Sequence, residues 1–265
     1  MPRFAANLSM MFTELPFPER FAAAAAAGFE AVEFLFPYDF PVEEVKARAD
    51  AAGVRIVLFN LPPGDWAAGE RGIAVFPGRA AEFTEGLARA LHYARGLGVP
   101  RLHLMAGIAA PDDAAAGRRY RAAIREAAGA AAESRIDILL EPLNRFDMPG
   151  YFLNDFDMAV DLIAELGLPN VRLQFDIYHR QLLHGNVTRA LREMLPVIGH
   201  VQTASVPMRG EPGTGELDDF ALFRLLDEIG YTGHVGCEYR PAAATRDGLG
   251  WMSRAGVGSS ASGVQ

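Results

Sequence analysis

Short apolar runs alternate along the chain with longer segments whose apolar residues recur at helical spacing. Eight of the short runs are apolar nearly throughout, which is typical of strands covered on both faces in a parallel sheet. These runs predict strands over residues 3–8, 31–34, 55–60, 101–105, 137–141, 171–176, 200–203 and 234–238. The longer segments predict helices over residues 18–27, 42–52, 79–97, 114–133, 155–166, 187–195 and 218–229.

Glycines follow five of these helices, where a C-terminal cap has to adopt a left-handed conformation. They are Gly28, Gly53, Gly98, Gly167 and Gly230. Eight strand–helix units at about 32 residues each match the size of a βα repeat with short loops. We therefore predict an α/β fold: a single (β/α)8 TIM barrel over residues 1–256, followed by a small, polar and disordered tail over 257–265. A doubly wound sheet is the alternative, but the segment NLSMMF follows the first strand where such folds carry a glycine-rich phosphate loop.

Composition narrows the class of protein. The 265 residues include 33 acidic and 25 basic side chains, for a net charge of -8, and this balance works against a nucleic-acid partner. The single cysteine, Cys237, excludes an internal disulfide and any multi-cysteine metal site, and we read it as a packing residue. The first residues do not resemble a secretory signal, and no apolar stretch approaches the ~20 residues that span a bilayer. We expect a cytoplasmic protein with no membrane partner.

Polar side chains end nearly all of the predicted strands, and in a TIM barrel the active site is built at these carboxyl ends. Carboxylates crowded at one mouth remain ionised when a cation neutralises them, and oxygen ligands suit Mg²⁺ or Mn²⁺. We therefore predict a divalent metal site. The alternative is a cluster of ion pairs with Arg145, Arg180, Arg209 and Arg240. The strand-end residues are Asn7, Glu33, Asn60, His103, Glu141, Asp176, Gln202 and Glu238.

Several long segments resemble the hydroxypyruvate isomerase family, within the xylose-isomerase-like barrel superfamily. The resemblance runs nearly end to end, and its segments are RFAANLSMMF, VEFLFPYDF, NLPPGDWAAGERGIA, LEPLNRFDMPGYFL, QFDIYHRQ, HVQTASVPMRGEPGTGEL and GCEYRP. It implies that Glu141 and Glu238 are the acid–base pair. Related ketose epimerases use a Glu, Asp, His, Glu metal set, and Gln202 stands here in place of the histidine, as it does in hydroxypyruvate isomerases. His179 resembles the superfamily's histidine that binds a substrate oxygen.

The resemblance implies a small 2-oxo acid as substrate, in glyoxylate metabolism, and its relatives often form homo-oligomers. The expected reaction interconverts hydroxypyruvate and 2-hydroxy-3-oxopropanoate through an enediolate, with proton transfer between two glutamates. A metal would act as Lewis acid, held by Glu141, Asp176, Gln202 and Glu238. The expected substrate-binding residues are His179, Arg209, His103 and Glu33.

Each of these positions has a structural alternative. Arg209, on the loop after the seventh strand, can hold a carboxylate through two hydrogen bonds, or can be a surface residue paired with Glu211 or Glu216. His103 and Glu33 either line the mouth or are buried and hydrogen-bonded. The loop over residues 62–72, which contains Trp66, is expected to be a lid over the site, with a rigid surface loop as the alternative.

Three other functions remain open at this point. The first is isomerisation of 2-oxo-tetronate or epimerisation of a ketose, with the same residues acting on a longer substrate. The second is metal-dependent phosphodiester hydrolysis, which the net charge of -8 and the six histidines disfavour. The third is a non-catalytic sugar-acid binding module, which would not require both glutamates.

Overall fold

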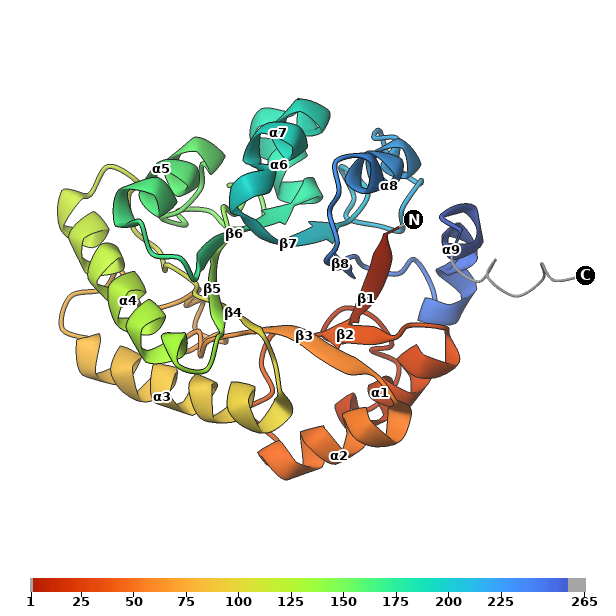
Figure 1. Ribbon diagram of the computed structural model, residues 1–265, viewed down its shortest axis with the longest axis horizontal. Helices are drawn as coiled ribbons and strands as arrows, with labels where there is room; N and C mark the ends of the chain where they lie inside the picture. Colours follow the sequence, from red (N-terminus) through yellow and green to blue (C-terminus); the bar gives the residue numbers. More distant parts are fainter. Residues whose placement is uncertain (1, 257–265) are drawn as a thin grey trace, which may run out of the picture.

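Eight parallel strands close into a barrel in the computed structural model, which describes residues 2–256 (Figure 1). β1 pairs with β2 on one side and with β8 on the other, which closes the sheet. The predicted TIM barrel is therefore confirmed. The strands are β1 (Arg3–Asn7), β2 (Ala31–Glu33), β3 (Arg55–Asn60), β4 (Arg101–His103), β5 (Asp137–Leu140), β6 (Val171–Asp176), β7 (Ile198–Thr203) and β8 (His234–Cys237).

Helices surround the barrel on its outside (Figure 1). All seven predicted helices are present within a few residues of their expected ends, and the five glycines that follow them have φ between 59° and 93°. They are α1 (Phe17–Ala26), α2 (Val42–Ala52), α3 (Ala80–Leu97), α4 (Ala114–Ala132), α5 (Phe156–Leu166), α7 (Val187–Met194) and α8 (Asp219–Glu228).

Four short elements were not predicted: α6 (Ile177–His184), α9 (Gly250–Arg254) and the 3₁₀ turns η1 (Leu195–Val197) and η2 (Thr245–Gly248). α6 begins directly after β6, where the Asp176 carboxylate accepts a hydrogen bond from the Tyr178 amide at 2.7 Å and caps the helix. An eight-residue helix is too short to show a clear helical period.

Three strand ends differ from the prediction at positions that belong to the site. The predicted extension of the fourth strand to residue 105 is wrong: β4 ends at His103, and beyond it the Ala106 amide donates to Tyr151 Oη instead of to a strand. Glu141 and Glu238 each lie one residue beyond the end of β5 and β8. The predicted tail over residues 257–265 lies outside the described residues.

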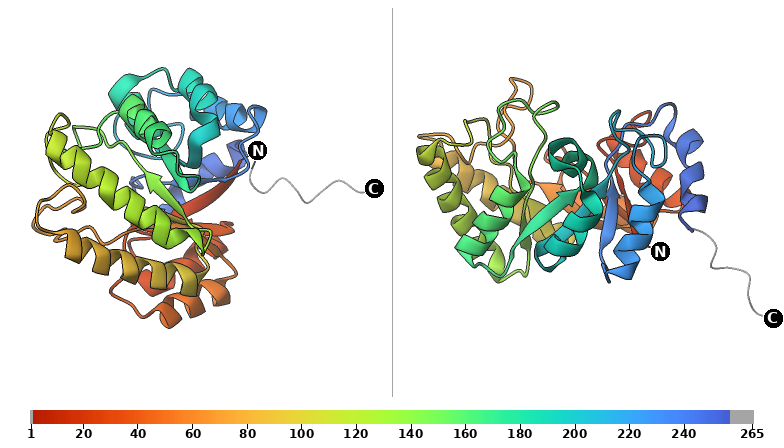
Figure 2. Two further views of the ribbon diagram at one scale, coloured as in Figure 1. Left: turned by 60° about the vertical axis from the view of Figure 1, so that its left-hand side comes forward. Right: turned by 90° about the horizontal axis from the view of Figure 1, so that it is seen from above.

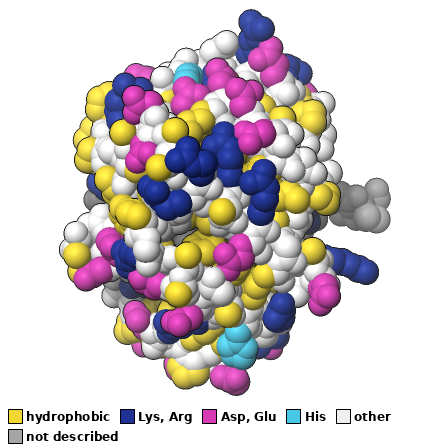
Figure 3. Space-filling view, turned by 90° about the vertical axis from the view of Figure 1, so that its left-hand side faces the viewer, with side chains coloured by type: hydrophobic (Ala, Val, Ile, Leu, Met, Phe, Trp, Pro, Cys, Tyr) yellow, Lys and Arg dark blue, Asp and Glu magenta, His cyan; other side chains and the backbone are white. Residues whose placement is uncertain are grey.

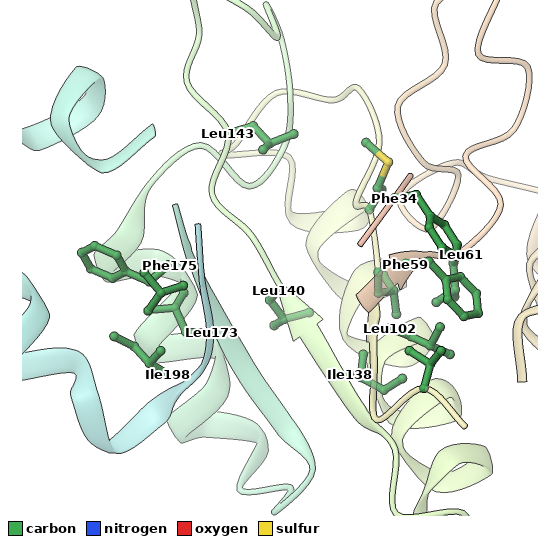
Figure 4. Packing of buried hydrophobic residues seen from close by; sticks show 14 of the residues in the cluster. Phe34, Phe59, Leu61, Leu102, Ile138, Leu140, Leu143, Leu173, Phe175 and Ile198 are labelled. Carbon is green, nitrogen blue, oxygen red and sulfur yellow. The ribbon is translucent and has the colours of Figure 1, made fainter. Parts of the chain in front are cut away.

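The barrel has separate hydrophobic layers outside and inside its wall. The larger cluster fills the space between strands and helices, and Figure 4 shows part of it, including Leu140 of β5 and Phe175 of β6. A small second cluster lies at inward-facing strand positions inside the barrel, next to buried polar side chains such as Gln174 and His200. It consists of Ala5, Ala31, Val57, Leu58 and Leu139. This plug divides the interior into two mouths, one at each end of the strands.

The two ends of the barrel also differ in their loops. Seen from above, long loops rise at one end of the molecule, while the N-terminus lies towards the other (Figure 2). On the side that carries α3 and α4, basic and acidic side chains lie next to one another (Figure 3). Among the described residues, no helix combines the length and hydropathy needed to cross a bilayer.

Candidate active site

A cavity of about 180 Å³ opens at the carboxyl ends of the strands. This is smaller than the ~300–1,000 Å³ of pockets for drug-sized ligands, so it suits a substrate of a few carbon atoms. Asp176 does not line the cavity but lies behind it, and its Oδ2 is 3.7 Å from His179 Nε2. The other predicted site residues all line it: Asn7, Glu33, Asn60, His103, Glu141, His179, Gln202, Arg209 and Glu238.

Arg209 is buried and holds two carboxylates together. Its Nη2 lies 3.0 Å from Glu238 Oε2 and 3.7 Å from Asp176 Oδ2, and its guanidinium lies 5.0 Å from the ring centroid of Tyr178. Pairing with Glu211 or Glu216 on the surface is therefore wrong, because the loop turns the side chain inward. The backbone of Arg209 has a φ of 55°, which is uncommon for a residue other than glycine and typical of functional sites.

Burial and mutual repulsion shift the carboxyl groups of the site towards their protonated forms. Burial raises the pKa of Glu238 to about 8, although the contact with Arg209 lowers it. Burial, together with the charges of Glu238 and Asp176, raises the pKa of Glu141 well above its ordinary value. Burial also raises the pKa of Asp176 to about 6. The burial of Arg209 lowers its pKa, but the surrounding carboxylates outweigh this and raise it overall.

Buried hydrogen bonds connect Glu141 to the opposite side of the barrel. Gln174 Nε2 donates to Glu141 Oε2 at 2.9 Å and to Gln202 Oε1 at 2.6 Å. Gln202 Nε2 in turn donates to Glu33 Oε1 at 2.7 Å, and Glu33 Oε2 lies 2.7 Å from His200 Nε2. The side chains of Gln174 and Gln202 are thereby fixed in orientation by partners on other strands.

Glu33 lies at the base of this chain. It is fully buried and also accepts a hydrogen bond from Asn7 Nδ2 at 3.0 Å. Gly236 makes room for it, because a Cβ on Gly236 would lie 2.2 Å from Glu33 Oε2. Glu33 thus lines the cavity and is also buried and hydrogen-bonded, so both alternatives predicted for this residue are observed at once.

His179 faces the cavity with its Nε2 atom. The Asn144 backbone amide donates to His179 Nδ1 at 3.0 Å, so Nδ1 carries no proton and the neutral ring carries its proton on Nε2. Burial and the charge of Arg209 lower the pKa of His179 well below its ordinary value, which keeps the ring neutral. His179 is therefore a hydrogen-bond donor at this face of the cavity.

The site contains oxygen atoms that suit a cation. Atoms of Glu141, Asp176 and His179 lie within 4.8 Å of one another. Glu141 Oε1 and Asp176 Oδ2 are buried without a hydrogen-bond partner among the described residues. Two unpartnered carboxylate oxygens fit a hard divalent cation. Because His179 Nε2 carries the proton in this arrangement, the candidate ligand atoms are the carboxylate oxygens, and His179 is a donor beside them.

The other predicted ligands are engaged elsewhere. Gln202 Oε1 already accepts from Gln174, and Glu238 Oε2 is paired with Arg209. The ion pairs expected as the alternative to a metal are thus present between Arg209 and both Glu238 and Asp176. Glu141 Oε1 and Asp176 Oδ2 nevertheless accept no hydrogen bond among the described residues, and they remain suited to a cation.

Two further predicted residues border the site. His103 is buried, and its Nδ1 lies 3.4 Å from Glu141 Oε2. Burial lowers the pKa of His103 to about 3, so the ring is neutral. Trp66 lines the cavity from the 62–72 loop, packs edge-on against Phe36 and stacks under Arg71 at 3.8 Å.

Four residues at or behind the site were not predicted as site residues. Gln174 and His200 lie two residues before Asp176 and Gln202, so strand alternation places them on the same inward face, and this signal could have identified them. Arg240 lines the cavity two residues after Glu238, and its side chain is exposed at the rim. Asn144 acts through His179, and no sequence signal pointed to it.

Comparison with known proteins agrees with this geometry. A family model described as xylose isomerase-like TIM barrel matches residues 21–255. The 2-oxo-tetronate isomerase of Cupriavidus necator is 52% identical over 254 residues, covering 95% of this chain and 98% of that protein. The hydroxypyruvate isomerase of Escherichia coli is 44% identical over 255 residues, covering 95% of this chain and 98% of that protein. The crystal structure of AP endonuclease, family 2, from Brucella melitensis has a TM-score of 0.94 at 48% identity, covering 96% of this chain and 99% of that chain.

Proposed function

Because this chain belongs to the hydroxypyruvate isomerase and 2-oxo-tetronate isomerase family of xylose isomerase-like TIM barrels, we propose that it isomerises a short 2-oxo acid. The first candidate reaction interconverts hydroxypyruvate and 2-hydroxy-3-oxopropanoate. The observation that carries the proposal is the pair of buried glutamates, Glu141 and Glu238, at one small cavity. Moving a proton between adjacent carbons requires a base and an acid on the same bound substrate.

Arg209 favours Glu238 as the base when hydroxypyruvate is the substrate. The guanidinium at 3.0 Å stabilises the ionised carboxylate of Glu238, whereas Glu141 has no cationic side chain at this distance among the described residues. Two carboxyl groups with different environments are the usual arrangement for separate base and acid roles. Glu238 removes a proton from the CH₂OH carbon, and Glu141 delivers one to the neighbouring carbon.

The remaining protons balance on oxygen. The hydroxyl proton of the starting CH₂OH group moves to the former carbonyl oxygen, and one proton returns from Glu238 to Glu141 between turnovers. His179 donates from Nε2 to a substrate oxygen and so stabilises the negative charge that develops on the enediolate. Arg240 at the rim and Arg209 inside the cavity are the cationic partners for the substrate carboxylate.

A divalent cation fits the oxygens of Glu141 and Asp176 that accept no hydrogen bond. Gln202 and Glu238, the other two ligands proposed from the sequence, would join it only by giving up or sharing their contacts with Gln174 and Arg209. When bound, such a cation supplies Lewis-acid polarisation of the substrate oxygens. The expected cation is Mg²⁺ or Mn²⁺, because the ligand atoms are oxygens.

The second candidate is isomerisation of 2-oxo-tetronate. It is favoured by the 52% identity to the Cupriavidus necator enzyme, against 44% to the Escherichia coli hydroxypyruvate isomerase. Both candidates use the same glutamates and differ in the length of substrate that the cavity of about 180 Å³ must hold.

Phosphodiester hydrolysis is disfavoured, since the cavity is small and the chain carries a net charge of -8.

The test is turnover of hydroxypyruvate and of 2-oxo-tetronate, measured side by side on metal-stripped and metal-restored protein. We expect kcat/KM for one of them to exceed the other, and the larger value identifies the substrate. Activity that falls on stripping and returns with Mg²⁺ or Mn²⁺ supports the cation. No turnover of either acid by well-folded, metal-restored protein would overturn the proposed function.

A further inference from the structure

A second and larger depression, of about 830 Å³, opens at the opposite end of the barrel, where the strands begin. We call it the N-terminal basin. Arg3, Arg55 and Arg101 are the first residues of β1, β3 and β4, and Arg172 is the second residue of β6. All four line the basin, together with Lys46 of α2. The lining is therefore strongly basic in a chain whose net charge is -8.

Acidic side chains leave most of this positive charge uncompensated. Of the described residues that line the basin, two are acidic, Asp50 and Asp137. Asp50 is paired with Lys46 one helical turn away. Asp137 forms no side-chain hydrogen bond or ion pair within residues 2–256, and it faces the charges of Arg101 and Arg172. Four guanidinium groups therefore line the basin beside one carboxylate that is not paired with Lys46, and this carboxylate faces two of them.

The arginines keep free hydrogen-bond donors after their contacts with the protein. Arg101 Nε donates to the Gly199 carbonyl at 2.8 Å, and Arg172 Nη2 donates to the Ile198 carbonyl at 2.8 Å. Each guanidinium has five N–H groups, so these bonds use a minority of them. Arg172 Nε is buried without a partner among the described residues, and Arg55 forms no side-chain hydrogen bond or ion pair in that part of the chain.

His234, the first residue of β8, lies in the basin, and the positive charge there affects the pKa of its side chain. Its side chain is buried, and Nε2 has no hydrogen-bond partner among residues 2–256. Burial, together with the charges of Arg3 and Arg55, lowers the pKa of His234 to about 4. The ring beside the arginines thus stays neutral to a lower pH than a histidine in water, down to about pH 4.

We propose that the N-terminal basin binds a small molecule that carries two or more phosphate groups. Guanidinium groups match phosphate oxygens in geometry and charge, and four of them arranged around one depression suit several phosphate oxygens at once. The volume lies within the range of pockets for small molecules, and a net charge of -8 disfavours a nucleic acid.

This second site is separate from the proposed catalytic cavity. The apolar plug of Ala5, Ala31, Val57, Leu58 and Leu139 lies between the two mouths. The bound polyanion would therefore not occupy the place of the substrate, and the proposal does not depend on which acid the enzyme isomerises.

The test uses inorganic pyrophosphate as the probe, titrated into the full chain by calorimetry at constant ionic strength. We expect saturable binding of one pyrophosphate per chain, with sulfate at equal ionic strength binding at least tenfold more weakly. Arg55→Gln should weaken binding about tenfold, because it removes a full positive charge without breaking a side-chain contact. Asp137→Asn should tighten binding a few-fold, since it removes the one unpaired carboxylate.

Arg224→Gln, on the exposed face of α8, is the matched control for charge and should change the affinity less than twofold. A histidine NMR spectrum locates the site, because pyrophosphate should shift the ring signals of His234. The proposal is overturned if pyrophosphate binds without saturation, if Arg55→Gln and Arg224→Gln weaken binding equally, or if substrate displaces the probe. Thermal unfolding of each variant shows whether weaker pyrophosphate binding is caused by loss of the folded structure.

Discussion

The two mouths of the barrel are lined by the same strands but carry different ionisable groups: carboxyl groups dominate one and arginines the other. β6 carries Arg172 as its second residue, in the N-terminal basin, and ends with Asp176 behind the catalytic cavity. β5 begins with Asp137 and leads to Glu141, and β8 begins with His234 and leads to Glu238. Residues four apart on a strand point to the same side and lie about 13 Å apart.

Burial and neighbouring charges shift the pKa values of the ionisable groups differently at the two ends of the barrel. Carboxyl groups at the catalytic mouth are buried against one another, which raises the pKa of Glu238 to about 8. At the basin, arginines surround His234 and burial excludes water, which lowers the pKa of its ring to about 4. One mouth therefore favours uptake of protons or cations, and the other favours anions. The apolar plug allows the two to coexist within one barrel.

The largest effect is expected from removing either glutamate of the catalytic mouth. Glu238→Gln and Glu141→Gln should each lower kcat by about 10²–10⁴-fold, because an amide cannot exchange the carbon-bound proton. Pyrophosphate affinity at the basin should stay unchanged, which calorimetry would check beside the kinetics. Glu85→Gln, at an exposed position of α3, is the matched control and should leave kcat unaffected. Full activity in either active-site variant would contradict the assigned pair.

A smaller effect is expected from crowding the buried Glu33 side chain at the inner end of the catalytic cavity. Gly236→Ala should destabilise the fold by about 1–3 kcal/mol, because its Cβ would overlap the buried Glu33 carboxylate. The displaced Glu33 would also release Gln202, so activity should fall as well. Gly129→Ala, on an exposed face of α4 with nothing within 4 Å of the added Cβ, should instead stabilise by about 0.5–1 kcal/mol. Denaturant melts measure both, and equal stability of the two variants would show that the space around Glu33 is not limiting.

The smallest effect concerns the titration of His234. Its pKa is lowered from 6.5 to about 4 by burial and by Arg3 and Arg55, so the folded state prefers the neutral ring. The unfolded chain binds the proton first as pH falls, and this contribution to stability is therefore lost between pH 6.5 and about 4. Arg55→Gln should raise the pKa of His234 towards 6.5, as followed by NMR.

His92, which lies on the exposed face of α3, serves as the control for this measurement. The NMR signals of its ring should be the same in Arg55→Gln as in the unchanged protein. An unaltered titration of His234 in the same variant would show that the arginine field does not reach the ring.

The sequence by itself determined the barrel and most of the catalytic mouth. Eight near-continuous apolar runs alternate with seven helical stretches, five of which are followed by a glycine, and this pattern is local enough to be recognised in a single sequence. Because the carboxyl ends of parallel strands meet at one mouth, Glu141, Gln202 and Glu238 could be placed together before any contact was known.

Tertiary structure decided which groups are paired and which are free. His200 meets Glu33 across 167 residues of sequence, a contact that exists only because the barrel closes. The inward turn of Arg209 and the proton position on His179 depend on the folding of loops, where no period constrains direction. The N-terminal basin was not predicted because arginines at strand starts also occur as solvated surface residues. Only the closed barrel shows that they face one depression and outnumber their carboxylate partners.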